Sequence, residues 1–178
     1  MACAITSGYT IDCRESVGGV QTVYLIENSA LYDASGNSRV LESSGTVTGL
    51  TKNTGKRFWK FEVPRGTAMA STNLTGSQEN GTIYYTHQVM FPINSRSATI
   101  RNTISTLAKN RVTFVTVEMD GTARMYGRDF GLFLDKAEGG SGTAAGDRNG
   151  SVLTFTSNEK DDFLVVPSNI VAALETAG

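Results

Sequence analysis

The chain has 178 residues, a length that suits one domain able to bury a hydrophobic core without disulfides or metals. Its formal net charge of −1 argues against a general nucleic-acid binder, because neutralising phosphates requires a basic surface. Charged residues make up 19% of the chain, and Gly, Thr and Ser are abundant, as in β-rich and turn-rich proteins. We therefore expect a single β-rich domain over residues 1–178.

The N-terminus contains neither a charged n-region nor a long apolar segment, and no window approaches the ~18 apolar residues of a membrane span. We expect no membrane span and synthesis in the cytoplasm, where Cys3 and Cys13 are reduced thiols. Their spacing is not a metal signature, and His87, the only histidine, is far away in sequence. The sequence therefore predicts no metal site.

Runs of β-branched and aromatic residues predict nine strands along the chain. The expected strands are residues 20–27, 39–49, 56–63, 67–75, 82–93, 112–119, 122–127, 130–134 and 151–157. The strand at 82–93 is the clearest, because alternation places Ile83, Tyr85, His87, Val89, Phe91 and Ile93 on one face.

A second core strand is predicted at residues 56–63, where Trp59, Phe61 and Val63 share one face, although Phe58 interrupts the alternation. Many short strands and few helices are typical of a sandwich or barrel. We therefore expect a mainly β fold, a two-sheet sandwich or barrel with one flanking α-helix at about 96–110.

The flanking helix is indicated by apolar residues at helical spacing, with a serine available to cap its N-terminus. Ile100, Ile104 and Leu107 recur at i, i+4 and i+7, and Ser95 or Ser97 precedes them. One side of this helix is therefore expected to be buried, as in an amphipathic surface helix.

Several connecting segments are predicted from their turn-forming residues. Asp120–Gly121 is typical of a type I′ hairpin turn between two strands. Segments 33–38 and 137–150 are poor in apolar residues, so we expect them to be mobile or ordered by a partner. At the C-terminus, Ser168 is expected to cap one or two helical turns over 170–175.

Motifs that suggest chemistry lack the surroundings that the chemistry needs. Gly140–Ala145 matches a dinucleotide fingerprint, but a strand rather than a helix follows it. Gly139–Thr143 misses the nucleophile elbow by one residue, and Asp147–Gly150 begins like a calcium loop but lacks its later glycine and glutamate. The acidic run at 159–162 is interrupted by Lys160 and is expected to form a solvated turn.

His87 is expected to be hydrogen-bonded in or beside the core rather than to act as a general base. We predict no catalytic residue, cofactor site or metal site, and a protein that is not an enzyme. Charge is distributed unevenly, with a net +4 over residues 1–128 and −5 over 129–178. Opposite ends of two copies are therefore expected to attract one another.

A series of short motifs appears in a characteristic order along the chain. The motifs are Met1-Ala-Cys3, Gly8-Tyr9, Asp12-Cys13-Arg14, Gly18-Gly19-Val20, Val23-Tyr24-Leu25, Glu79-Asn-Gly-Thr82, Leu107-Ala-Lys-Asn-Arg111, Asp120-Gly121, Met125-Tyr-Gly127, Gly131-Leu-Phe-Leu134, Gly142–Gly150 and Leu153–Glu159. In this order the chain resembles virion proteins of tailed bacteriophages, of the type seen in phages of Bacteroidetes hosts. Over nearly its whole length it is similar to their tail tube family, although the region 28–55 matches least.

The resemblance implies two packed β-sheets with a flanking helix, and protomers that form hexameric rings stacked around the DNA-ejection channel. It implies a virion tail location after synthesis in the bacterial host cytoplasm. The implied partners are further copies, other tail or capsid proteins, and DNA that passes transiently without specific binding. On this basis, residues 30–51 and 137–150 are expected to contact the neighbouring ring, and the acidic excess after residue 128 to line the lumen.

Two alternatives remain open at this point. A phage capsid decoration protein or head-to-tail connector is also a small β domain with polar loops. A carbohydrate-binding β-sandwich is the more distant alternative, in which Trp59 and surface tyrosines such as Tyr84 stack on sugar rings.

Overall fold

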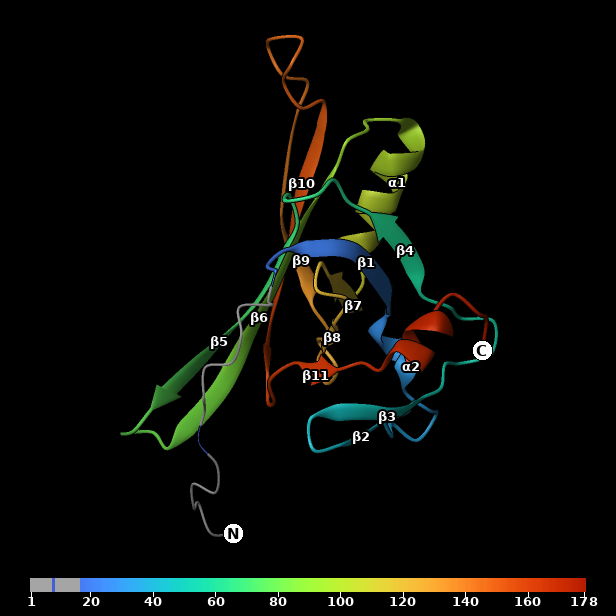
Figure 1. Ribbon diagram of the computed structural model, residues 1–178, viewed down its shortest axis with the longest axis vertical. Helices are drawn as coiled ribbons and strands as arrows, with labels where there is room; N and C mark the ends of the chain where they lie inside the picture. The colour runs from blue at the N-terminus through green and yellow to red at the C-terminus, as the bar shows by residue number, and fades with distance from the viewer. Residues whose placement is uncertain (1–7, 9–16) are drawn as a thin grey trace.

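The computed structural model describes Gly8 and residues 17–178, and over these residues the chain is mainly β (Figure 1). The larger sheet contains β1 (Val20–Glu27), β2 (Val40–Ser43), β3 (Thr46–Leu50), β4 (Trp59–Glu62), β7 (Val112–Glu118), β8 (Ala123–Tyr126) and β11 (Leu164–Val165). The smaller sheet contains β5 (Met69–Ser77), β6 (Thr82–Ile93), β9 (Phe133–Gly140) and β10 (Gly150–Glu159). The strand orders are β2-β3-β11-β8-β7-β1-β4 and β5-β6-β10-β9, so both sheets are open and the fold is a sandwich rather than a closed barrel.

The two sheets pack face to face through an aromatic cluster. Phe91 of β6 and Phe155 of β10 stack with their ring centroids 5.9 Å apart. Phe114 of β7, in the opposite sheet, contacts Phe155 edge-on at 4.9 Å. All three side chains are fully buried, together with Leu153 and Leu132. The predicted two-sheet sandwich is therefore confirmed, and its core lies where the two sheets face each other.

The opposite face of the larger sheet is also covered. A second cluster of buried residues brings together Phe58, Val47 and Met125 with Leu31 of the 3₁₀ helix η1 (Asn28–Leu31). The C-terminal segment, which includes α2 (Ser168–Ala172), packs against this cluster. Strand β7 is buried from its first to its fifth residue, because both of its faces are covered.

The predicted flanking helix is α1 (Ala98–Leu107), which lies within the expected range. The Ser97 side chain accepts a hydrogen bond from the Ile100 N–H at 3.3 Å, so Ser97 is the N-cap. Leu107 is buried and Ile104 packs against the core between the sheets. The spacing of the apolar residues thus correctly predicted which side of the helix is buried.

One strand prediction and one turn prediction were wrong. Residues 39–49 form two strands, because Ser44 and Gly45 both adopt positive φ (51° and 76°), as a type I′ hairpin requires. In the Asp120–Gly121 hairpin only Gly121 has positive φ, so that turn is not type I′. The Glu118 N–H donates to the Thr122 carbonyl at 2.8 Å, which closes a three-residue loop with a glycine at its last position.

The C-terminal helix and the long predicted loop also differ from expectation. Helix α2 begins at Ser168 and its first turn shows no side-chain capping bond, so Ser168 does not cap it. Residues 137–140 belong to β9, and the connection to β10 spans only 141–149. Gly150 pairs with Gly140 in the sheet.

Segment 33–38 is ordered by its own side chains. Asp33 accepts hydrogen bonds from the Ser35 and Asn37 N–H groups, each at 2.8 Å. These bonds, together with one from the Asn37 side chain, hold the pKa of Asp33 below its ordinary value. The turn therefore does not need a partner to fix its shape.

The smaller sheet extends beyond the larger one at both ends (Figure 1). At one end β5 and the start of β6 form a projecting hairpin, which we call the β5–β6 arm (residues 74–84). At the opposite end the hairpin of β9 and β10 projects past helix α1. Inward-facing residues of β6 are buried from His87 to Phe91, whereas Thr82 to Tyr84 are exposed.

Candidate functional site

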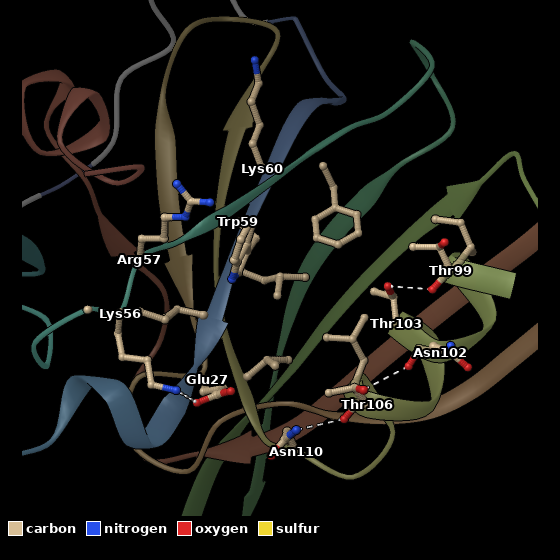
Figure 2. A pocket seen from close by; sticks show the side chains of 17 residues that line it. Glu27, Lys56, Arg57, Trp59, Lys60, Thr99, Asn102, Thr103, Thr106 and Asn110 are labelled. Carbon is tan, nitrogen blue, oxygen red and sulfur yellow. Dashed lines mark hydrogen bonds and ion pairs between the residues drawn. The ribbon is translucent and has the colours of Figure 1, made fainter. Parts of the chain in front are cut away.

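A groove of about 840 Å³ lies between helix α1 and the part of the larger sheet formed by β1 and β4 (Figure 2). We call it the β4–α1 groove. The apolar part of its lining is buried or half-buried and consists of Leu25, Ile26, Phe61, Ile100, Leu107 and Val112. An accessible apolar lining of this size is suited to a ligand or a segment of another protein.

The rim of the groove on the β4 side carries three cations. The Lys56 ammonium contacts the Glu27 carboxylate at 2.7 Å. The Lys60 ammonium pairs with Glu62 at 3.0 Å, and this hydrogen bond raises the pKa of Lys60. Arg57 forms no ion pair with any residue between 17 and 178. Arg57 is therefore the rim cation best able to bind an additional anion.

Trp59 lies at the same rim and is 56% exposed, so its predicted place in the core was wrong. Phe58 occupies the core instead, because the chain before β4 is held by the Phe58 N–H, which donates to the Leu174 carbonyl at 3.1 Å. The Arg57 guanidinium lies 4.2 Å from the centre of the Trp59 ring, a cation–π contact. The adjacent aromatic residues that broke the strand alternation were the sequence signal for this arrangement.

The helix side of the groove is polar but uncharged. Thr103 and Thr106 donate their hydroxyl hydrogens to the carbonyls of Thr99 and Asn102, each at 3.0 Å (Figure 2). Asn110 donates its side-chain amide to the Thr106 carbonyl at 2.9 Å. The groove thus combines an apolar lining, a cationic rim and a neutral rim, which suits non-covalent binding of an apolar segment with a nearby carboxylate.

His87 is buried between the sheets, as predicted. Its Nδ1 accepts a hydrogen bond from the Gly127 N–H at 3.2 Å, and its ring packs edge-on against Tyr126. Burial lowers the pKa of His87, with partial opposition from the negative charge of Asp162. The imidazole is therefore neutral near pH 7, and its Nδ1 is engaged by the backbone.

Glu159 is buried, which corrects the expectation that residues 159–162 form a solvated turn. It follows Leu153, Phe155 and Ser157 on the inward face of β10, whereas Asp161 lies beyond the strand and is exposed. Burial raises the pKa of Glu159, although several hydrogen-bond donors oppose the shift.

The Glu159 carboxylate organises the turn that follows β8. It accepts the Asp129 N–H at 2.9 Å and the Phe130 N–H at 3.1 Å. Asn28 donates its side-chain amide to the Arg128 carbonyl of the same turn at 3.0 Å, and Tyr32 donates its hydroxyl to that carbonyl at 2.9 Å. This network ties the two sheets together and is structural.

Part of the acidic excess after residue 128 is neutralised within the protomer. The Arg128 guanidinium contacts the Asp129 carboxylate at 2.9 Å and the Asp161 carboxylate at 2.8 Å. Glu159 is buried, so it does not contribute to a solvent-facing acidic surface. A uniformly acidic lumen built from this segment therefore has fewer free carboxylates than the sequence indicates.

The motifs that resembled nucleotide, nucleophile and calcium sites all fall at the end of the β9–β10 hairpin. Residues 139–140 are strand, and 141–149 form its exposed connection. Asp147 accepts the Thr143 and Ala144 N–H groups at 2.7 and 2.8 Å, so it stabilises a turn. These bonds lower the pKa of Asp147.

Two further expectations concern metals and membranes. Among Gly8 and residues 17–178, no group of three or more His, Cys, Asp or Glu side chains is placed to hold a metal ion. Cys3 and Cys13 lie outside the described residues. None of the described helices has the length and apolar character needed to cross a membrane.

The two most exposed large apolar side chains of the smaller sheet, Leu74 and Ile83, lie on the β5–β6 arm. Leu74 is 61% exposed, Ile83 69% and Tyr84 38%. The alternation of residues predicted that Ile83 faces the core. Strand β6 extends past the end of the larger sheet, however, so its first residues, Thr82 to Tyr84, are exposed within residues 17–178. Tyr84 lies on this arm, far from Trp59 on β4, so the two do not form one aromatic platform (Figure 1).

No family model matches the chain, and no curated protein is significantly similar to it.

Proposed function

We propose that this chain is a structural virion protein of a tailed bacteriophage, the major tail tube protein, whose copies form stacked hexameric rings around the DNA-ejection channel. Its location is the virion tail, after synthesis in the host cytoplasm. Its partners are further copies of itself and other tail or capsid proteins, and DNA passes through without specific binding. The chain performs no catalysis in this role.

The observation that carries the proposal is the exposed, extended smaller sheet. Both of its outer strands, β5 and β9, are edges in the protomer, and exposed sheet edges tend to pair with another chain. The projecting arm adds apolar side chains, Leu74 and Ile83, to that uncovered surface. Pairing of edges between copies closes a ring, which leaves no strand edge unpaired and covers the exposed apolar side chains.

The outward face of this sheet also suits passage of DNA. Its central positions carry uncharged polar residues, among them Ser71, Thr86, Gln88 and Asn158. The Thr86 hydroxyl donates to the Asn158 side-chain oxygen at 3.0 Å, so neighbouring strands share this face. Lys136 of β9, opposite Thr154 on the same face, is paired with Glu138 at 2.8 Å, so the electrostatic attraction of this face to phosphates is weak.

Static light scattering over a concentration series tests the proposal. We expect the wild-type protein to assemble above a threshold concentration, because several edge and arm contacts form together. The double variant Leu74→Ser/Ile83→Ser is expected to raise that threshold. Thr122→Ser, at an exposed position in the β7–β8 turn and outside the segments expected to contact another ring, is expected to leave it unchanged. A wild-type protein that stays monomeric at every concentration would contradict the proposal and favour a capsid decoration or connector protein.

The exposed Trp59 beside the β4–α1 groove favours a carbohydrate-binding module as a second candidate. Arg57 already lies over the Trp59 ring, so sugar binding requires that contact to open. Binding of oligosaccharides by the wild-type monomer, lost in Trp59→Ala, is the result that supports this alternative.

A further inference from the structure

We propose that the β5–β6 arm of one copy docks into the β4–α1 groove of a second copy. The inference rests on the proposed self-assembly and names the two surfaces that make one of its contacts. It follows from the side chains of the arm, the chemistry of the groove, and the positions of both in the protomer.

The arm presents an apolar strip that the protomer leaves uncovered. The β5–β6 register pairs Leu74 with Tyr85 and Gly76 with Ile83, so these four residues share the face on which Val89 is buried farther along β6. Ile83 lies over Gly76, where an added Cβ would be 3.7 Å from it. The strip therefore continues the core-facing side of the sheet past the point where the larger sheet ends (Figure 1), and its Leu74 and Ile83 are exposed.

The groove has the complementary character. Its lining is apolar, and its β4 rim carries Arg57, the rim cation that pairs with no carboxylate in the described part of the chain. From Leu74 to Ile83 the arm carries one charge, Glu79, at its tip. Apolar side chains of the arm thus match the lining, and Glu79 matches Arg57, as expected for electrostatic complementarity between partners.

The two surfaces lie on opposite sides of the protomer, so the arm does not reach its own groove (Figure 1). The β5–β6 arm projects away from the rest of the protomer, whereas the groove opens between α1 and β4. A contact between two different surfaces is heterologous, and repetition of it produces a closed ring or an open filament. One arm and one groove per copy are sufficient for every copy to have two neighbours.

Cysteine cross-linking tests the contact directly. In a background with Cys3→Ser and Cys13→Ser, one copy carries Ile83→Cys on the arm, and a second, larger tagged copy carries Ile100→Cys in the groove. A short bismaleimide is expected to give a cross-linked heterodimer on a denaturing gel. The matched control replaces the groove cysteine by Thr122→Cys in the exposed β7–β8 turn, and its heterodimer band is expected to fall to background.

A charge exchange provides a second measurement in the same cross-linking assay. Glu79→Lys on the arm copy, or Arg57→Glu on the groove copy, is expected to reduce the yield, and the two together are expected to restore it. Circular dichroism checks that each variant is folded. Failure of the double exchange to restore the yield, or equal yields with Ile100→Cys and Thr122→Cys, would overturn the docking.

Electron microscopy of the same samples separates this inference from the proposed function. Rings or tubes without the specific cross-link overturn the docking and leave the proposed function standing. Specific cross-links in short open chains, without rings, support the docking and contradict the tail tube. Absence of both assembly and cross-link rejects both.

Discussion

Replacing Phe155 with alanine is expected to lower the free energy of unfolding by about 3–5 kcal/mol, the range for removal of a fully buried aromatic side chain. Phe155 is fully buried, stacks on Phe91 within its own sheet, and contacts Phe114 of the opposite sheet. The substitution therefore opens a cavity at the point where the two sheets meet. Urea unfolding followed by far-UV circular dichroism measures the loss.

The matched control is Phe133→Ala on β9, where the same side chain is 48% exposed. A substitution away from buried contacts is expected to change stability by no more than about 0.5 kcal/mol. Similar losses at the two positions would mean that the sheets are not packed through the Phe155 cluster.

Replacing Glu159 with alanine is expected to cost about 1–3 kcal/mol, because the partly buried N–H groups of Asp129 and Phe130 lose their acceptor. Glu159→Gln is expected to cost less, since its carbonyl oxygen accepts the same N–H groups and its amide donates to Ser157. Thermal and urea unfolding of the two variants tests this order. Equal losses would show that the carboxylate does not organise the turn.

The same residue gives stability a pH dependence of known sign. Burial raises the pKa of Glu159 above its ordinary 4.5, so the folded state binds a proton that the unfolded state releases. The free energy of unfolding is therefore expected to decrease as pH rises from about 4.5 through the raised pKa, and then to level off. His87, whose pKa is lowered, gives a slope of opposite sign below its ordinary 6.5.

The difference between wild type and Glu159→Gln isolates the contribution of the carboxylate, because His87 is present in both proteins. Wild type is expected to lose stability relative to the variant as pH rises through this window. A difference that does not change with pH would contradict the raised pKa.

Local patterns predicted the elements in which one physical signal dominates. Strand β6 matches residues 82–93 because alternation of apolar and polar residues is sustained over its inner half. Helix α1 was predicted from Ile100, Ile104 and Leu107, and its cap from a serine at the preceding position. The neutral, hydrogen-bonded His87 followed from its place on the apolar face of β6.

Other features depend on tertiary contacts that no local pattern encodes. Strand β11 has two residues, and it exists because Leu164 and Val165 fill a space between β3 and β8. Glu159 was misplaced because an acidic neighbourhood indicates solvent, whereas the β10 alternation decides its direction. The β4–α1 groove is lined by residues from β1, β4 and α1, which are far apart in the sequence. Arg57 became a candidate binding residue only because the fold places it beside this apolar lining.

The β5–β6 arm also shows a tertiary feature that a local pattern does not encode. The pattern correctly gave Ile83 an inward-facing position on β6, but it was silent on where the opposing sheet ends. An apolar residue left exposed in this way favours a partner copy as the missing cover. We therefore expect the β5–β6 arm to be buried when copies assemble.

Negative-stain electron microscopy of the purified wild-type protein, above the threshold found by light scattering, tests the central claim most directly. The account predicts ring-shaped top views with six-fold symmetry and tubes of constant width with a stain-filled channel. Discrete particles the size of a single protomer at every concentration would contradict it.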